Sequence, residues 1–193
     1  MKSKSNGATL VEIIQHYLSR TRSSLQRHQR ININTILRET LLLLKPIFQQ
    51  HHVQVRSTFA DTLPLLNGDE ASLQRVFINL FNNAVDAMNG GGVITLVTRM
   101  GSFPNSVRPG VVIEIADSGE GIPADVLPHI FDLFMTTKTS GKGTGLGLAV
   151  CQEIIKGHDG RIDITSMVGE GTCVHVFLPA EENIPLPRIE DRQ

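Results

Sequence analysis

The chain has 193 residues, of which 40% are hydrophobic and 19% are charged, and its formal net charge at pH 7 is -1. This composition is typical of a globular protein and excludes a disordered or collagen-like chain, and no apolar run reaches the roughly 18 residues that a membrane span needs. Two cysteines, Cys151 and Cys173, are too few for a disulfide framework, and no His or Cys stands at zinc-ligand spacing. Because the N-terminus does not read as a signal peptide, we expect a cytoplasmic protein.

The first predicted element is a helix at about residues 9–27, in the basic part of the chain. Thr9 and Glu12 have the spacing of a capping box, and apolar residues follow at helical period. Residues 1–60 carry nine Lys/Arg and two Asp/Glu, a charge of +7, whereas residues 61–193 carry nine and seventeen, a charge of −8. A basic segment can bind nucleic acid, but these charges are spread around helical faces and residues for base stacking are nearly absent. We therefore expect a solvated helix that docks on another protein, and no nucleic-acid partner.

A second helix is expected to begin at a cap on Asn34 and to kink at Pro46. Its apolar positions are Ile36, Leu37, Leu41, Leu44 and Phe48. Val53–Phe59 alternates like a strand, and Pro64–Gly68 is expected to form a turn.

The strongest helical pattern spans Asp69–Met88. Seven apolar residues form one continuous face at i, i+3, i+4, i+7, i+8, i+11 and i+15: Leu73, Val76, Phe77, Leu80, Phe81, Ala84 and Met88. Further elements are strands at Val93–Thr98, Val111–Ala116, Arg161–Thr165 and Thr172–Leu178, a short helix near Ala124–Leu127, and a helix at Leu146–Lys156. Helices and strands are mixed, but not as regular βαβ units. This order predicts a two-layer α/β sandwich with a mixed β-sheet.

The polar face of the Asp69–Met88 helix is the first candidate for chemistry. Asn79, Asn83 and Asp86 lie within about 60° of each other at 100° per residue. An amide oxygen suits Mg²⁺, which prefers oxygen ligands. The alternative is that the two asparagines only bridge neighbouring loops.

Two glycine-rich segments follow. Asp117-Ser118-Gly119-Glu120-Gly121-Ile122 comes directly after a strand, where a carboxylate followed by alternating glycines lets the backbone approach a flat ligand; an ordinary tight turn is the alternative. Gly141-Lys142-Gly143-Thr144-Gly145-Leu146-Gly147-Leu148 leads into a helix, an arrangement that favours an anion site over a simple hinge because Lys138 and Lys142 are near. It matches neither a P-loop nor a dinucleotide fingerprint. Residues 135–144 are polar and are expected to form a lid that nucleotide orders.

Together, these segments resemble the nucleotide-binding boxes of sensor histidine kinases, members of the GHKL ATPase superfamily with its Bergerat ATP-binding fold. The boxes are Asn79-Leu80-Phe81-Asn82-Asn83-Ala84, the Asp117 segment, Phe131-Asp132-Leu133-Phe134-Met135-Thr136-Thr137-Lys138, and the Gly143 segment. The resemblance covers roughly residues 32–180 and is strongest to the nitrogen-regulation subgroup. It extends to Gly169-Glu170-Gly171-Thr172.

The resemblance implies a role for each matching residue. Asn83 would ligate Mg²⁺, with Asn79 one turn earlier, and Asp117 would accept the adenine amino hydrogen. Glycines shape the adenine pocket (Gly119 and Gly121) and cradle the phosphates (Gly143, Gly145 and Gly147). Lys138 would face the phosphates as the catalytic residue. Thr144, Leu146 and Thr172 complete the expected ATP contacts.

The sequence departs from these kinases in one respect, because none of its seven histidines stands in the family's phosphoacceptor box. The resemblance therefore implies a catalytic module that transfers the ATP γ-phosphoryl group to a histidine supplied outside this chain, for relay to a response regulator. The alternative is a nucleotide-gated binding module without phosphotransfer. Gyrase-type ATPases, mismatch-repair ATPases and chaperones of the superfamily typically carry a Glu one turn before the Mg-binding Asn, and Asn79 holds that place here.

The expected organisation has three parts. Residues 1–31 resemble the end of a dimerisation hairpin, residues 32–180 form the catalytic and ATP-binding domain, and residues 181–193 form a loose tail. The implied partners are ATP with Mg²⁺, a response regulator receiver domain and a histidine-bearing dimerisation domain.

Overall fold

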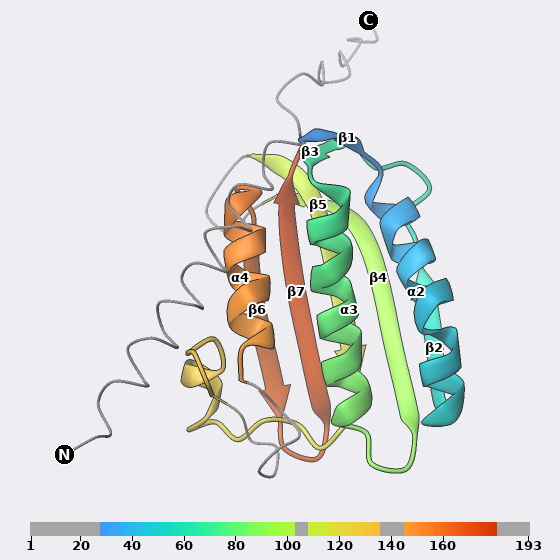
Figure 1. The fold of residues 1–193 in the computed structure, drawn as a ribbon, viewed down its shortest axis with the longest axis vertical. Coiled ribbons are helices and arrows are strands. Elements are labelled where there is room, and N and C mark those ends of the chain that lie inside the picture. The colour runs from blue at the N-terminus through green and yellow to red at the C-terminus, as the bar shows by residue number, and fades with distance from the viewer. Residues whose placement is uncertain (1–27, 103–107, 136–144, 181–193) are drawn as a thin grey trace, which may run out of the picture.

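The computed structural model describes residues 28–102, 108–135 and 145–180 (Figure 1). The helix predicted over residues 9–27, the segment at 136–144 and the tail from residue 181 lie outside this part of the chain, as do the expected site residues Lys138, Gly143 and Thr144.

Three helices form one layer of the fold. They are α2 (Ile33–Gln50), α3 (Glu70–Asp86) and α4 (Gly147–Gly157), and all three lie on the same face of the sheet (Figure 1). The seven apolar residues predicted for the core face of the Asp69–Met88 helix are all buried, and the last of them, Met88, lies two residues beyond the end of α3. Asp69 caps the helix by accepting a hydrogen bond from the Ser72 N–H at 3.3 Å. Among the described residues, none of the helices combines the length and the apolar character that crossing a membrane requires.

A five-stranded sheet forms the other layer. Its strands are β2 (Val53–Thr58), β4 (Gly92–Ser102), β5 (Pro109–Asp117), β6 (Arg161–Met167) and β7 (Gly171–Pro179), in the order β2-β4-β5-β7-β6. Strands β2 and β4 pair in parallel, and the other neighbours pair antiparallel. The predicted two-layer α/β sandwich with a mixed sheet is therefore confirmed.

A second, two-stranded sheet corrects the prediction of a turn at Pro64–Gly68. Strand β3 (Leu66–Gly68) pairs antiparallel with β1 (Gln29–Ile31), which the sequence did not indicate. Both strands have only three residues, too few to display a period of two. They form because Ile31 and Leu66 are buried in the same core as the long helices. The domain limits of 32 and 180 stay a prediction. Strand β1 shows that residues 29–31 also pack with the described domain.

The start of α2 is a second correction. The N-cap is Asn32, whose side chain accepts a hydrogen bond from the Asn34 N–H at 3.0 Å. The Asn34 side chain instead donates to the Ala60 carbonyl at 3.0 Å and accepts from the Thr98 hydroxyl at 2.9 Å, so it ties the helix to the sheet layer. The helix continues through Pro46 to Gln50.

Two buried side chains, Cys151 in α4 and His158 at its C-cap, join this helix to α3 and to its N-cap Asp69. The Cys151 thiol lies 3.8 Å from the Val76 carbonyl, and burial raises its pKa to about 12. His158 accepts a hydrogen bond at Nε2 from the Asp69 N–H at 3.0 Å, and its Nδ1 lies 2.7 Å from the Ile154 carbonyl. Because a carbonyl only accepts, Nδ1 carries the ring proton and the imidazole is neutral. Burial lowers the pKa of His158 from its ordinary value of 6.5, against weaker opposing contributions from the Ile154 carbonyl, Asp69 and Asp159.

We expect the fold to lose stability on acidification through His158. The unfolded chain takes up a proton near pH 6.5, whereas the folded chain resists it until the lowered pKa is reached, so the contribution is complete above pH 6.5 and is lost below it. Urea unfolding of the parent and of His158→Gln at pH 7.5 and 5.5 measures this effect. The fall in unfolding free energy should be smaller in His158→Gln than in the parent. A His51→Gln control, which removes an exposed imidazole, should behave like the parent, and identical falls in all three would contradict the prediction.

Candidate functional site

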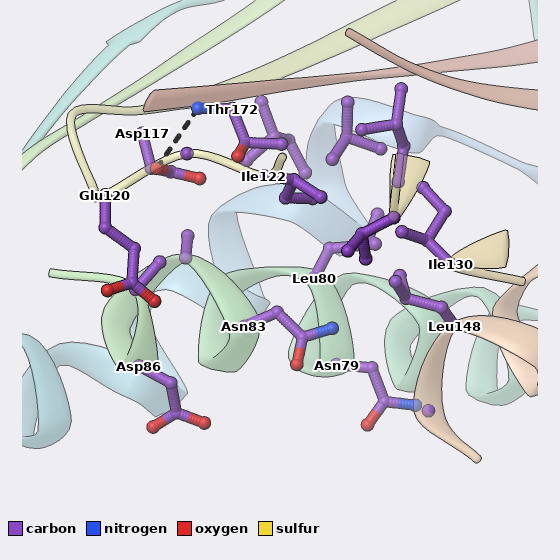
Figure 2. Close-up of a pocket in the computed structure, with 18 of the residues that line it drawn as sticks. Asn79, Leu80, Asn83, Asp86, Asp117, Glu120, Ile122, Ile130, Leu148 and Thr172 are labelled. Carbon is purple, nitrogen blue, oxygen red and sulfur yellow. Dashed lines mark hydrogen bonds between the residues drawn. The ribbon is translucent and has the colours of Figure 1, made fainter. Parts of the chain in front are cut away.

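A cavity of about 390 Å³ lies between the helix layer and the sheet, at the ends of β5 and β7 (Figure 2). Its volume is within the range of about 300–1,000 Å³ typical of small-molecule sites. The predicted site residues that line it are Asn79, Asn83, Asp117, Gly121, Gly145, Gly147 and Thr172. Gly119 and Leu146 adjoin these residues in the chain without lining the cavity.

The polar stripe of α3 forms one wall. Asn79, Asn83 and Asp86 all line the cavity, and Figure 2 shows them on one side of the helix. The adjoining apolar face of α3 is buried in the core. The packing of that face therefore determines the direction in which the stripe points.

Asp117 stands across the cavity, as the last residue of β5. Its Oδ1 accepts hydrogen bonds from the Gly119 N–H at 2.9 Å and from the Thr172 N–H at 3.3 Å (Figure 2 marks the second). Burial raises the pKa of Asp117, and the two hydrogen bonds oppose this shift. Both of these bonds use Oδ1, so the carboxylate is held in one orientation with Oδ2 as the oxygen that is left for a ligand.

The loop after Asp117 has no space for side chains at its glycines. A Cβ on Gly119 would lie 2.7 Å from the Ala87 carbonyl oxygen. Gly121 has a φ of +73°, and a Cβ there would lie 2.1 Å from the Met167 carbonyl oxygen. The Glu120 N–H also donates to the Ala87 carbonyl at 3.1 Å. The loop is therefore clamped between the end of α3 and the turn between β6 and β7.

Ser166 is a residue beside the site that the sequence analysis did not single out. Its hydroxyl oxygen accepts from the Ile122 N–H at 2.8 Å, its proton goes to the Gly171 carbonyl at 2.8 Å, and it lies 2.9 Å from the Thr172 hydroxyl oxygen. The alternation of β6 could have indicated it, because Ser166 follows Ile162 and Ile164 on the side of the strand that faces the helices.

The third predicted segment meets the cavity at the start of α4. Gly145 has a φ of +65°, and a Cβ there would lie 2.4 Å from the Phe134 backbone. Its carbonyl accepts from the Phe134 N–H at 2.9 Å. The N-cap of α4, Leu146, makes no side-chain cap hydrogen bond, and Gly147 at the start of the helix lines the cavity, so this helix N-terminus lies at the cavity.

The remaining wall is apolar, and the sequence analysis did not assign its residues to the site, although it named Leu80 in the core face of α3 and quoted Ile122 and Leu148 in the glycine-rich segments. The residues of this wall are Leu80, Ile115, Ile122, Val126, Ile130, Leu148, Ile164 and Val174. Val126 and Ile130 flank a short 3-10 helix, η2 (Leu127–His129), which corrects the helix predicted near Ala124–Leu127. Proline at residue 128 lacks an N–H, so the segment does not extend into an α-helix.

The arrangement fits a purine nucleotide. An oriented carboxylate oxygen lies at the sheet side, apolar side chains provide a slot for a flat ring, and amide oxygens and a helix N-terminus lie on the helix side. Among the described residues, no group of three or more His, Cys, Asp or Glu could hold a metal by itself. A cation at this site would therefore share its coordination with ligand oxygens.

Comparison with known families agrees with this interpretation. Residues 68–182 match the family model described as histidine kinase-, DNA gyrase B-, and HSP90-like ATPase. The chain is 37% identical over 151 residues to sensor histidine kinase ZraS of Escherichia coli (strain K12). The matched residues are 78% of this chain and 31% of ZraS. It is 36% identical over 152 residues to sporulation kinase C of Bacillus subtilis (strain 168), covering 78% of this chain and 34% of that kinase. The chain thus spans about a third of the length of these curated relatives.

Solved structures agree as well. The fold is similar to the catalytic domain of histidine kinase ThkA, with a TM-score of 0.67 and 27% identity over 79% of this chain and 95% of that domain. It is also similar to full-length ShkA in complex with AMPPNP, with a TM-score of 0.69 and 24% identity over 96% of this chain and 41% of ShkA. At 24% identity, the similarity to ShkA shows a shared fold alone.

Proposed function

Because the chain belongs to the family of histidine kinase-, DNA gyrase B-, and HSP90-like ATPases, we propose that it is the catalytic part of a two-component sensor histidine kinase. In this role it transfers the γ-phosphoryl group of ATP to a histidine supplied outside this chain, for relay to a response regulator receiver domain. We propose that the reaction takes place in the cytoplasm, where ATP is available.

The observation that carries the proposal is the position of Asp117 opposite the asparagines of α3 in one cavity. A carboxylate with one free acceptor oxygen is suited to the exocyclic amino group of adenine. Asp117 and Asn83 lie on opposite sides of one cavity, so a nucleotide bound by its base at Asp117 would present its phosphates toward Asn83 (Figure 2). This polarity supports Gly119, Gly121 and Thr172 as base-side residues, and Gly145, Leu146 and Gly147 as phosphate-side residues.

The residues on the phosphate side also fit Mg²⁺. Asn83 would supply one amide oxygen, and Asn79 lies one turn away on the same wall. A site with few protein ligands suits Mg²⁺, which keeps several waters and shares its coordination with phosphates. When bound there, the ion would neutralise charge on the phosphates.

In the proposed reaction, the unprotonated imidazole nitrogen of the acceptor forms a bond to the γ-phosphorus while the bond to the β–γ bridging oxygen breaks and ADP leaves. The other ring nitrogen then releases its proton to solvent. This chain acts mainly by positioning and charge neutralisation. The backbone N–H groups at the start of α4 would hold the phosphates. We propose Lys138, Gly143 and Thr144 as further phosphate contacts, with Lys138 as the catalytic cation.

The test is phosphotransfer in trans. The purified chain is incubated with γ-labelled ATP and a dimerisation hairpin that carries an acceptor histidine, and nucleotide binding is measured separately. We expect acid-labile label on the hairpin, and none on a hairpin with that histidine replaced by Gln. ATP binding without any transfer would instead support a nucleotide-gated binding module that performs no chemistry. A chain that binds no ATP would overturn both functions.

A further inference from the structure

The ring of His158 lies where the small β1–β3 sheet meets α3 and α4. His158 is the C-cap of α4 and is buried. Asp69, which follows β3 and caps α3, donates its N–H to His158 Nε2 at 3.0 Å. Gly68 of β3 packs so closely that a Cβ on it would lie 2.7 Å from His158 Cδ2. The ring of His28, the residue before β1, has its centroid 5.3 Å from that of His158. The small sheet therefore rests on one imidazole.

The two hydrogen bonds of this ring are compatible with the neutral imidazole alone. The Asp69 N–H can only donate, so Nε2 must be without a proton. The Ile154 carbonyl, 2.7 Å from Nδ1, can only accept, so Nδ1 carries the ring proton. A second proton would have to bind at Nε2, where it would face the Asp69 N–H. Because two donors cannot form a hydrogen bond, a protonated His158 cannot keep its contact with the junction of β3 and α3.

Among the described residues, three titratable groups influence His158 from the elements around it. They are His28 ahead of β1, Asp69 at the N-cap of α3, and Asp159 just after α4. Burial has the largest effect and lowers the pKa of His158 from its ordinary value of 6.5, and His28 lowers it further. The Ile154 carbonyl and the two aspartates act in the opposite direction without cancelling the effect of burial. The closed junction therefore resists protonation, whereas an opened junction would take up a proton near pH 6.5.

We propose that His158 is a pH-sensitive switch for strand β1, whose protonation opens the β1–β3 pair while α3, α4 and the large sheet stay folded. The opening is local because β1 and β3 have three residues each and pair with one another in a sheet of their own at one end of the domain (Figure 1). Residues 1–27 join the domain through β1, so the switch would loosen the attachment of that segment. This inference does not depend on the proposed kinase function.

The size of the effect follows from the proton taken up on opening. If the ring has a pKa near 6.5 when the junction is open and a lower one when it is closed, the opening equilibrium rises by up to about tenfold between pH 7.5 and 5.5. The nucleotide cavity is distant from this event. Asn83 lies about 21 Å further along α3 than Asp69, at 1.5 Å per residue. The switch therefore acts on the attachment of β1 and leaves the cavity walls in place.

The experiment is hydrogen exchange of the backbone amides of the full chain, followed by NMR at pH 7.5 and 5.5. Rates are converted to protection factors, which removes the intrinsic effect of pH on exchange. We expect the amides of β1 and β3 to lose up to about tenfold in protection at pH 5.5. In His158→Gln they should lose much less, because a side-chain amide accepts and donates hydrogen bonds but does not titrate in this range. His51→Gln, which removes an exposed imidazole, is the matched control and should behave like the parent.

A low concentration of urea distinguishes local opening from unfolding of the whole domain. Urea promotes an opening in proportion to the surface that the opening exposes. Exchange in β1 should therefore respond weakly to urea, and exchange in the central strand β5 should respond strongly. If β1 responds as strongly as β5, the pair opens only with the whole domain and the proposed switch is wrong. An equal loss of protection in the parent and in His158→Gln would also overturn it.

A measurement on the parent chain keeps the proposal testable if His158→Gln does not fold. The ¹⁵N chemical shifts of the ring nitrogens report which of them carries a proton. We expect a protonated Nδ1 and an unprotonated Nε2 at pH 7.5, with the neutral form persisting below pH 6.5 in the folded chain. A His158 ring that takes up its second proton at or above pH 6.5 while β1 stays protected would overturn the switch.

Discussion

Replacing Asp117 by asparagine should weaken ATP binding by about 100-fold, and it should do so without unfolding the chain. The N–H groups of Gly119 and Thr172 both point to Oδ1, so the amide oxygen of the variant takes that place and its NH₂ group takes the place of Oδ2. A donor then faces the adenine amino group, which is also a donor. A hydrogen bond to a charged group contributes about 1.5–3 kcal/mol, and facing donors add to this loss. Calorimetric titration with ATP measures the change.

The stability of Asp117→Asn distinguishes a binding role from a structural one. Burial raises the pKa of Asp117, so the folded chain favours the protonated carboxyl, and the resulting stabilisation is present at low pH and lost as pH rises through the folded pKa. At neutral pH the charge therefore opposes folding. Asparagine keeps an acceptor for both N–H groups without that charge, so its thermal midpoint at pH 7 should equal or exceed that of the parent. Asp125→Asn, which changes an exposed aspartate, should alter neither property. A lower midpoint in Asp117→Asn together with weaker binding would contradict the binding role.

Replacing Asn83 by alanine should weaken ATP binding at least about tenfold in the presence of Mg²⁺, and much less when the ion is chelated. Even outer-shell partners of a bound metal typically contribute that much to affinity, and Asn83 is proposed as a direct ligand. Its side chain lies on the helix side of the cavity, across from Asp117, so it would act through the metal and not through the base. Titrations with ATP in Mg²⁺ and in EDTA measure both values.

The adjacent residue Asn82 provides the control for Asn83. It also lies on α3 and is partly exposed, but it does not line the cavity. Asn82→Ala should bind ATP like the parent in both buffers. A loss in Asn83→Ala that is the same with and without Mg²⁺ would show that the side chain contacts the nucleotide or the fold directly, and the metal assignment would be wrong.

The elements that could be predicted from the sequence are the ones with long repeated patterns. The core face of α3 repeats over four turns, and the strands of the large sheet are long enough to alternate. Strands β1 and β3 could not be predicted in this way, because three residues are too few to show an alternating pattern. Their buried residues, Ile31 and Leu66, are covered by parts of the chain that are distant in sequence. The cap of α2 was misplaced for a related reason. Asn32 and Asn34 are equally good caps locally, and only the contacts of Asn34 with Ala60 and Thr98 decide between them.

The residues of the candidate site also include some that could be predicted from the sequence and some that could not. Asn83, Asp117 and the glycines stand in short motifs whose resemblance to known boxes pointed to them directly. The apolar slot has no motif, because residues such as Val126, Ile164 and Val174 come from separate elements and gain a function only when the fold brings them together. Ser166 is similar, since its partners at 122 and 171–172 are set by the pairing of β6 with β7 and by the loop after β5.

The two-sided use of α3 limits how its length can change. One face of the helix is buried in the core, and an adjoining stripe lines the cavity. Adding or deleting one residue rotates everything beyond it by about 100°. Between Leu73 and Asn83, such a change would turn the asparagines away from the cavity and place polar groups against the core at the same time. Point substitutions in this segment can affect folding or binding separately, but an insertion or deletion cannot. We therefore expect homologous chains to vary in length in the connections between elements and to keep the number of residues in α3 constant.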